Sequence, residues 1–211
     1  MPRPSHRSGT ARSGWRLGAG IALWGGLLAC GFGALVSYEM RPGSRADAPL
    51  RWPRESKLQA GPHRYSLVMF AHPKCPCSRA SLANLESLLV AAPGEISMTI
   101  CFYDPAGETS EWAETRLVRT ARAIPGLKVV LDRDGQLAVE FGAKTSGQVL
   151  VFDRDGRQVF DGGLTSARGH EGEDQGGRHL LALARGETRS PLSTPVYGCA
   201  LREKSALAAQ P

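Results

Sequence analysis

Cysteine is scarce in this chain, with five residues among 211. They are too few and too scattered for a small fold held together by several disulfides. Acidic residues are missing from the first 38 positions, where four arginines precede residue 17. The net charge of +6 comes from the first 57 residues, because basic and acidic residues balance from residue 58 onward. The folded part therefore lacks the cationic excess that a nucleic-acid-binding surface needs.

Charged side chains are absent from residues 17–38, LGAGIALWGGLLACGFGALVSY. About 20 apolar residues span a bilayer as a helix, and glycines in such a helix let neighbouring helices approach closely. A cleaved signal peptide is the main alternative, but its apolar core usually has only about 7–15 residues. A lipoprotein would use Cys30, yet the apolar run continues well past it. We predict a basic cytoplasmic tail over 1–16 and an uncleaved transmembrane helix over 17–38.

The orientation of this helix does not follow from positive charge alone, because basic residues lie on both sides of it. Acidic residues dilute the second group, and long domains translocate largely regardless of charge. We expect a single-pass membrane protein with its domain on the extracytoplasmic, periplasmic side, where stable disulfides form. Residues 39–62 contain four prolines and no apolar periodicity, which predicts a semi-extended linker.

Strand and helix patterns alternate after the linker. The runs YSLVMFA (65–71) and ISMTICFY (96–103) are nearly continuously apolar, as expected of strands buried on both faces. Leucines at helical spacing separate them. The further elements that we predict are a helix over 111–122, a strand over 127–132, a short helix over 137–141, a hairpin over 148–163, a helix over 175–185 and an irregular tail over 187–211. This order predicts an α/β sandwich of parallel strands with an antiparallel edge.

Cys75 and Cys77 flank Pro76 where the first strand meets the leucine-patterned helix. Proline suits the first turn of a helix. Cys75 would then cap the helix, with its sulfur facing unpaired N–H groups and the positive end of the helix dipole. This environment favours the reactive thiolate. Cys77 becomes the resolving partner, and a disulfide across one intervening residue closes a very small, labile ring.

Two alternatives for this pair stay open at this point. The cysteines can be ordinary small residues in a strand-to-helix turn. They can also be soft ligands for Cu(I) or zinc, joined by His72, His170 or Cys199. His72 is three residues from Cys75 and can reach it, whereas His170 lies in a polar, glycine-rich loop.

The positions of the other three cysteines give weaker indications of a function. Cys30 lies in the membrane span, and Cys101 in the middle of a strand predicts a buried, inert thiol. Cys199 has no local partner, but it becomes a second-stage redox partner if the tail folds back over the site. No organic cofactor is expected, since no glycine pattern follows a strand in a phosphate-cradling form.

From about residue 63 to 186 the chain resembles the thioredoxin-like superfamily, and its layout is similar to the membrane-tethered extracytoplasmic thiol–disulfide proteins of the TlpA/ResA kind. LKVVLDRDGQLAVEFGA resembles the central βα insertion of those proteins, and FGAKTSGQVLVFDRDGRQVFDGGL resembles their hairpin. The C-P-C pair, the TSG segment, the RGHEGEDQGG loop and the late YGC together resemble the group labelled RedB. The resemblance implies a thioredoxin-like domain over 63–186, and protein thiols or disulfides as clients.

The chain departs from that family at two places. The family's redox motif is C-x-x-C, whereas here one loop residue is missing. The family's cis-proline, which shapes the substrate groove and keeps metal away from the thiols, corresponds to Gly147. A glycine there eases metal access, although Ser146 and Gly147 do not supply the histidine that a copper-chaperone relative would carry. A peroxiredoxin would have threonine at the position of His72.

We therefore predict an extracytoplasmic thiol–disulfide oxidoreductase in which Cys75 and Cys77 are catalytic. His72, Gly147, Cys199 and His170 are the accessory candidates. The alternatives are a copper-binding or copper-delivery module that uses Cys75, Cys77 and His72, and a redox-inactive thioredoxin-like interaction domain.

Overall fold

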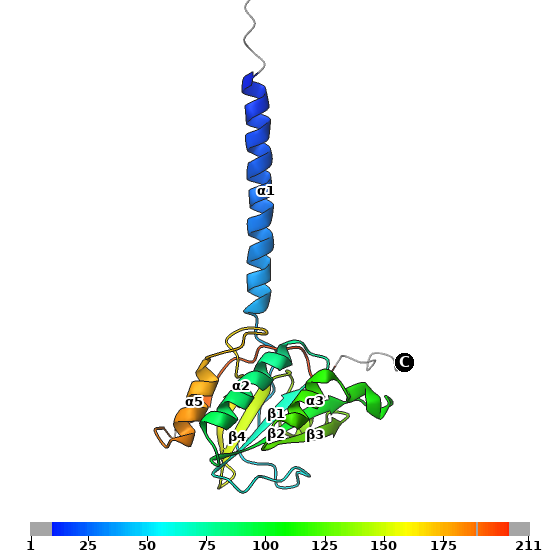
Figure 1. The fold of residues 1–211 in the computed structure, drawn as a ribbon, viewed down its shortest axis with the longest axis vertical. Helices are drawn as coiled ribbons and strands as arrows, with labels where there is room; N and C mark the ends of the chain where they lie inside the picture. Colours follow the sequence, from blue (N-terminus) through cyan, green and yellow to red (C-terminus); the bar gives the residue numbers. More distant parts are fainter. Residues whose placement is uncertain (1–9, 189, 203–211) are drawn as a thin grey trace, which may run out of the picture. The chain divides into compact units, whose positions relative to one another are not determined.

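The computed structural model describes residues 10–188 and 190–202, which fall into two units that separate after Met40. The first unit is a single helix, α1 (Thr10–Glu39), drawn as one uninterrupted coil in Figure 1. Its segment Gly14–Glu39 has a mean hydropathy of 1.9 and buries none of its residues. Twenty-six helical residues extend about 39 Å, so α1 fits a single-pass anchor. The part of the predicted basic tail before residue 10 lies outside the described residues.

The second unit is built on one six-stranded sheet with the strand order β3-β2-β1-β4-β5-β6. The strands β1, β2 and β3 are parallel, whereas β4 is antiparallel to both of its neighbours, β1 and β5. The bounds are β1 Tyr65–Ala71, β2 Ile96–Asp104, β3 Leu127–Arg133, β4 Gln148–Asp153, β5 Gln158–Gly162 and β6 Leu192–Ser193. All seven residues of β1 are buried, as its continuous apolar run predicted.

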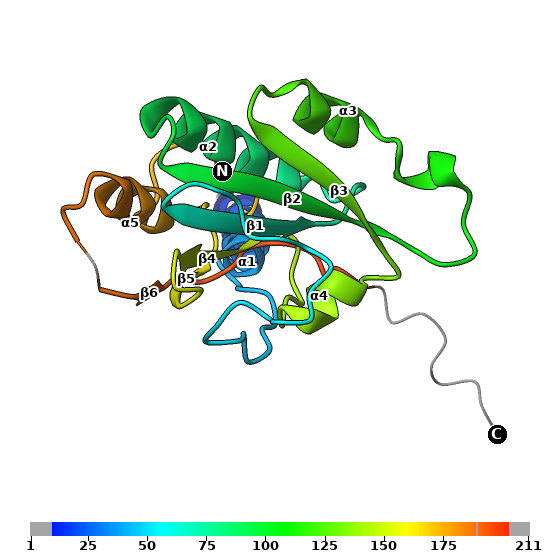
Figure 2. The ribbon, with the colours of Figure 1, turned by 90° about the horizontal axis from the view of Figure 1, so that it is seen from below.

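Helices cover both faces of the sheet. They are α2 (Cys77–Ala91), the 3-10 helix η1 (Ser110–Ala113), α3 (Arg116–Ala123), α4 (Gln136–Glu140) and α5 (Gln175–Ala184). Figure 2 shows α2 and α3 over one face and α4 beneath the other. The larger apolar core lies between the sheet and α2, α3 and α5, and a smaller core lies beneath the sheet around Phe141. The predicted α/β class and the β3–α4 insertion are confirmed.

The predicted helix over 111–122 is divided into η1 and α3. Between them Thr115 has an extended backbone, and its side chain accepts a hydrogen bond from the Val118 N–H at the start of α3. The Thr115 hydroxyl also donates to the Pro73 carbonyl, 2.9 Å away. This capping threonine begins a new helix, which is why the pattern does not continue through it.

The predicted linker over 39–62 differs from the structure, because residues from 41 onward belong to the second unit. Trp52 packs edge-on against Phe141 and Phe152, with 5.2 Å between ring centroids in each pair. Its indole N–H donates to the Leu58 carbonyl, and Leu58 itself is buried. A few well-placed apolar side chains thus fix a segment that has no periodic pattern.

The predicted irregular tail also packs onto the second unit. We call residues 192–202 the C-terminal strap. The strap pairs with β5 through β6, and it buries Val196 and Leu201. An isolated antiparallel bridge joins Ala200 to Thr145, just before β4. Cys199 therefore has a fixed place in the fold, while the rest of the predicted tail, 203–211, lies outside the described residues.

Candidate functional site

The loop between β1 and α2 places Cys75 at the amino end of a helix. Pro76, with φ −65° and ψ −30°, already has a helical backbone one residue before α2 begins. The Cys75 carbonyl accepts the Ser78 N–H at 3.2 Å, and the Cys75 N–H donates to the His72 carbonyl at 3.1 Å. Both bonds tighten the turn, so the cysteine cannot swing away from the helix start.

The Cys75 sulfur is buried but surrounded by hydrogen-bond donors. Cys75 is only 4% exposed. Burial acts to raise the pKa of its thiol, but the backbone and side chain of Cys199 and the side chain and backbone of Ser78 donate hydrogen bonds to the sulfur. These donors outweigh the burial and lower the pKa. Donors directed at a buried sulfur stabilise its charged form, which is the nucleophile in thiol chemistry.

A short chain of hydroxyl groups ends on this sulfur. The His72 N–H donates to Ser146 Oγ at 2.7 Å, and Ser146 Oγ lies 2.6 Å from Ser78 Oγ. Either hydroxyl can be the donor in this pair, and the Ser78 side chain in turn hydrogen-bonds to Cys75. Sequence reasoning missed Ser78 and did not give Ser146 this role, since serines in a helix start and a loop have many uses.

The thiols of Cys77 and Cys199 lie beside Cys75, and we call these three residues the thiol cluster. At neutral pH the thiols of Cys77 and Cys199 keep their protons, because the pKa of each is raised. Burial raises the pKa of Cys77, and the neighbouring Cys75 charge adds to this, against an opposing effect of Arg168. Burial, together with the hydrogen bond to Cys75 and the charge on it, raises the pKa of Cys199 to about 12. Cys75 is therefore the thiol of the cluster that ionises most readily, because its pKa is lowered while those of Cys77 and Cys199 are raised.

Arg168 ties the strap to this cluster. Its Nη1 donates to the Gly198 carbonyl at 2.6 Å, and Nη2 reaches the Arg41 carbonyl at 3.4 Å. Its charge favours the ionised forms of both Cys77 and Cys199. Sequence reasoning missed this arginine, because a single cation in a polar loop gives no signal of where it points.

His72 forms part of an aromatic wall beside Cys75. Its buried ring stacks on Tyr103, 5.8 Å between centroids, and meets Trp112 edge-on at 5.5 Å. Its Nδ1 accepts the Lys74 N–H at 3.1 Å, and the Lys74 ammonium lies 3.9 Å from the centre of the Trp112 ring. The wall borders a cleft of about 530 Å³, lined by His72, Lys74, Cys75, Tyr103, Pro105, Ala106, Glu108, Trp112, Cys199 and Ala200. We call this the aromatic cleft.

The two remaining accessory candidates, Gly147 and His170, lie in different places: Gly147 is next to α2, and His170 is away from the aromatic cleft. Gly147 lies below the start of α2 with φ +93°, and a Cβ there would meet Ser81 Oγ at 2.9 Å. Its N–H donates to the Phe70 carbonyl, and no peptide bond in the described ranges is cis. His170 is exposed and does not line the aromatic cleft. Within residues 10–188 and 190–202 no three His, Cys, Asp or Glu side chains are grouped to hold a metal ion. Copper binding by Cys75, Cys77 and His72 stays a prediction.

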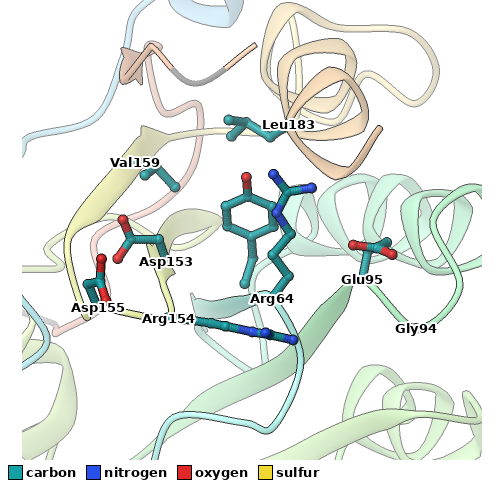
Figure 3. A pocket seen from close by; sticks show the side chains of 9 residues that line it. Arg64, Gly94, Glu95, Asp153, Arg154, Asp155, Val159 and Leu183 are labelled. Carbon is teal, nitrogen blue, oxygen red and sulfur yellow. The ribbon is translucent and has the colours of Figure 1, made fainter. Parts of the chain in front are cut away.

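A second cleft, of about 430 Å³, lies at the other end of β1. Figure 3 shows Asp153 and Asp155 on one side of it, Glu95 on the other, and Arg64 and Arg154 between them. Arg64 also lies 5.3 Å from the centre of the Tyr65 ring. This cleft has no thiol in its lining, whereas Cys75 follows the opposite, carboxyl end of β1. The two clefts therefore differ in the side chains that they offer: charged groups in this one, and the Cys75 and Cys199 thiols in the aromatic cleft.

Comparison with known proteins finds solved structures of similar fold. No protein-family model matches the sequence, and no curated protein matches it. An uncharacterized conserved protein from Geobacillus kaustophilus is 19% identical, over 79% of this chain and 94% of its own, with a TM-score of 0.57. A hypothetical protein from Sinorhizobium meliloti is 20% identical, over 79% and 96%, also with a TM-score of 0.57. A secreted disulfide oxidoreductase of Mycobacterium tuberculosis is 13% identical over 58% and 81%, but its TM-score of 0.41 carries no argument about activity. The chain has the thioredoxin-like fold that its sequence predicts.

Proposed function

We propose that this thioredoxin-like chain is a membrane-anchored, extracytoplasmic thiol–disulfide oxidoreductase that acts on protein thiols. Cys75 is the nucleophile and Cys77 the resolving residue. The observation that supports this most is the convergence of hydrogen-bond donors on the Cys75 sulfur, which lowers its pKa in a buried place. A thiol that only fills space in a turn has no need of such donors.

The reaction follows from the distribution of protons in the cluster. The Cys75 thiolate attacks one sulfur of a client disulfide, forms a mixed disulfide and releases the other client sulfur as a thiolate. Cys77, once deprotonated, attacks the Cys75 sulfur and releases the client's second sulfur. Two electrons pass to the client, and a Cys75–Cys77 disulfide remains. A dithiol reductant then restores both thiols, and the reverse sequence oxidises a client dithiol. This chemistry uses no cofactor.

The client reaches Cys75 through the aromatic cleft. Because Cys75 is almost fully buried, only a narrow, extended segment of a client can bring its sulfur into contact. The rings of His72, Tyr103 and Trp112 offer apolar faces to such a segment. This favours a flexible, cysteine-containing part of a protein as the client over a rigid surface.

The proposal is tested by the rate at which each thiol of the full-length protein in detergent reacts with iodoacetamide. Cys75 should react fastest at neutral pH, with an apparent pKa below the free-thiol value of about 8.5. Cys75→Ser should abolish reduction of a model protein disulfide, whereas Cys30→Ser, in α1, should leave it unchanged. Slow alkylation of Cys75 together with an active Cys75→Ser variant would instead favour the redox-inactive interaction domain.

The proposed location places α1 across a bilayer and the second unit in the periplasm. Disulfides persist in that compartment and are reduced in the cytosol. A reporter enzyme that is active only outside the cytoplasm, fused after Met40, should therefore be active. Activity confined to a reporter that works only in the cytoplasm would contradict this location.

A further inference from the structure

The C-terminal strap is paired with the segment that precedes β4. The Ser146 N–H donates to the Cys199 carbonyl at 2.8 Å, and the Leu201 N–H donates to the Lys144 carbonyl at 2.9 Å. Thr145 and Ala200 form the antiparallel bridge between these two bonds. One backbone hydrogen bond on each side of the bridge fixes both the position and the direction of the Cys199 backbone.

Close packing prevents the strap from shifting. A Cβ on Gly198 would lie 1.9 Å from the Ser146 carbonyl oxygen, so only glycine allows this approach. Arg168 holds the Gly198 carbonyl from another side. The Gly43 N–H donates to the Val196 carbonyl at 2.8 Å, which ties the strap to the segment that follows α1. Cys199 is therefore presented to the cluster by a rigid support.

The strap places the Cys199 side chain next to the Cys75 sulfur. Both the N–H and the thiol of Cys199 donate hydrogen bonds to the Cys75 sulfur, and the two residues line the same cleft. A thiol that already donates to a neighbouring sulfur needs only a small side-chain movement to bond to it.

The Cys77 side chain also hydrogen-bonds to Cys75, but Cys77 is less well placed for a lasting disulfide. Pro76 has a helical backbone and Cys77 is the first residue of α2, so the backbone between the two cysteines is held by the helix start. A Cys75–Cys77 disulfide therefore has to distort the start of α2, in a ring that spans one intervening residue. Distorted disulfides are the more reducible ones. A Cys75–Cys199 disulfide joins two separate segments and leaves α2 intact.

We propose that Cys199 is a third redox residue, and that a Cys75–Cys199 disulfide is the stable oxidised form to which a transient Cys75–Cys77 disulfide converts. This rests on the proposed function of Cys75. In the conversion the Cys199 thiolate attacks the Cys75 sulfur, and the Cys75–Cys77 bond breaks. The electron pair leaves on the Cys77 sulfur, which takes the proton that Cys199 has lost. One disulfide is exchanged for another, so no oxidant or reductant is consumed.

The charges of the cluster set the order of these steps. In the reduced protein burial raises the pKa of Cys199, and the hydrogen bond to Cys75 and the charge on Cys75 raise it further, against the effect of Arg168. Once Cys75 is in a disulfide its negative charge is gone, while Arg168 still favours the Cys199 thiolate. Oxidation of Cys75 therefore makes Cys199 easier to ionise while its burial persists, and before that step Cys199 competes less with Cys75 for the client.

The test is disulfide mapping on the full-length protein in detergent. The reduced protein receives one equivalent of diamide, and free thiols are then blocked with N-ethylmaleimide at acidic pH. Trypsin yields the peptide 75–79, which contains Cys75 and Cys77, and the peptide 190–202, which contains Cys199. We expect the two peptides to be joined, with one alkylated thiol. The long loop closed by this bond also makes the intact chain migrate faster in a non-reducing gel.

Variants identify the bonded sulfurs. Cys77→Ser should keep the link to peptide 190–202, Cys75→Ser should lose it, and Cys30→Ser should behave like the wild type. Gly198→Ala, which pushes the strap away from Ser146, should slow formation of the link by about tenfold or more. The Cys199→Ser protein should be left with the Cys75–Cys77 disulfide, and dithiothreitol should reduce it at least about ten times faster than the wild-type disulfide.

Two results would overturn the inference while leaving the proposed function intact. One is a wild-type protein that holds a Cys75–Cys77 disulfide with Cys199 alkylated. The other is a link that survives in Cys75→Ser and is lost in Cys77→Ser, which would join Cys199 to Cys77. A wild-type protein in which Cys75 forms no disulfide with either residue would instead contradict the proposed function itself.

Discussion

The Cys75 sulfur depends on neighbours that donate hydrogen bonds to a negative charge. Ser78 supplies a backbone N–H and a hydroxyl, and Cys199 supplies a backbone N–H and a thiol. Hydrogen bonds to charged groups contribute about 1.5–3 kcal/mol each. Water cannot readily replace a lost donor at a side chain that is buried. Removal of a single donor should therefore shift the balance between thiol and thiolate measurably.

Ser78→Ala removes the hydroxyl donor and leaves the backbone donor in place. We expect the pKa of Cys75 to rise, and its alkylation rate at neutral pH to fall about three- to tenfold. The fall is smaller than the loss of thiolate alone would give, because a thiolate of higher pKa is intrinsically more nucleophilic. The measurement is the rate of iodoacetamide labelling of Cys75 followed by mass spectrometry.

The matched control is Ser87→Ala, in the same helix. The Ser87 hydroxyl is exposed and donates only to the Ala83 carbonyl, so this change should not alter the alkylation rate. A Ser78→Ala protein that reacts as fast as the wild type would show that the hydroxyl chain from His72 does not reach the sulfur.

The segment after α1 and the C-terminal strap hold each other in place through Arg45. Its guanidinium donates to the Thr194 carbonyl and the Ser193 hydroxyl, both at 2.9 Å. It also pairs with the Asp161 carboxylate of β5, at 2.5 Å, and the two side chains are only 27% and 15% exposed. One cation thus joins three segments that lie far apart in the sequence, and it braces the strap that carries Cys199.

Arg45→Ala should lower the free energy of unfolding by about 2–3 kcal/mol, because it leaves the partly buried Asp161 without its cation and removes the donor to the Thr194 carbonyl and the Ser193 hydroxyl. Hydrogen exchange should accelerate at strap amides, including that of Thr194. Arg122→Ala is the control, since Arg122 pairs with Glu114 on the surface and such pairs contribute less than about 1 kcal/mol. Equal losses of stability in denaturant titrations of the two variants would show that Arg45 does not brace the strap.

Local patterns account for the elements that were predicted correctly. Continuous apolar runs predicted β1 and β2, which are buried on both faces, and leucines at helical spacing predicted α2, which buries one face. The segment after α1 and the strap have no such face and are ordered by a few distant contacts, such as Trp52 on Phe141. The position of Cys75 at the start of α2 was predictable for the same reason. Its contacts with Cys199 were not, since no local rule says where an irregular tail will pack.

Within the second unit as a whole, the thiols of Cys75, Cys77 and Cys199 influence one another's titration. The folded-state pKa of Cys75 is lowered from the ordinary value of 9.0, so its contribution to stability is present above pH 9 and is lost as the pH falls through the lowered value. Cys199 behaves in the opposite way, with a folded-state pKa of about 12. Its contribution is fully present below pH 9 and is lost as the pH rises toward 12. The pKa of Cys77 is raised as well.

Reduced wild-type protein should therefore lose stability more steeply between pH 9 and pH 12 than reduced Cys199→Ser protein. In this range the unfolded chain releases the Cys199 proton while the folded chain retains it, so rising pH favours unfolding. Serine has nearly the same shape but does not titrate here, and the lysine and tyrosine ionisations are common to both proteins. The measurement is the melting temperature of each full-length protein across this range, in detergent with excess reductant. Parallel curves for the two proteins would show that the strap does not hold Cys199 against the Cys75 charge in solution.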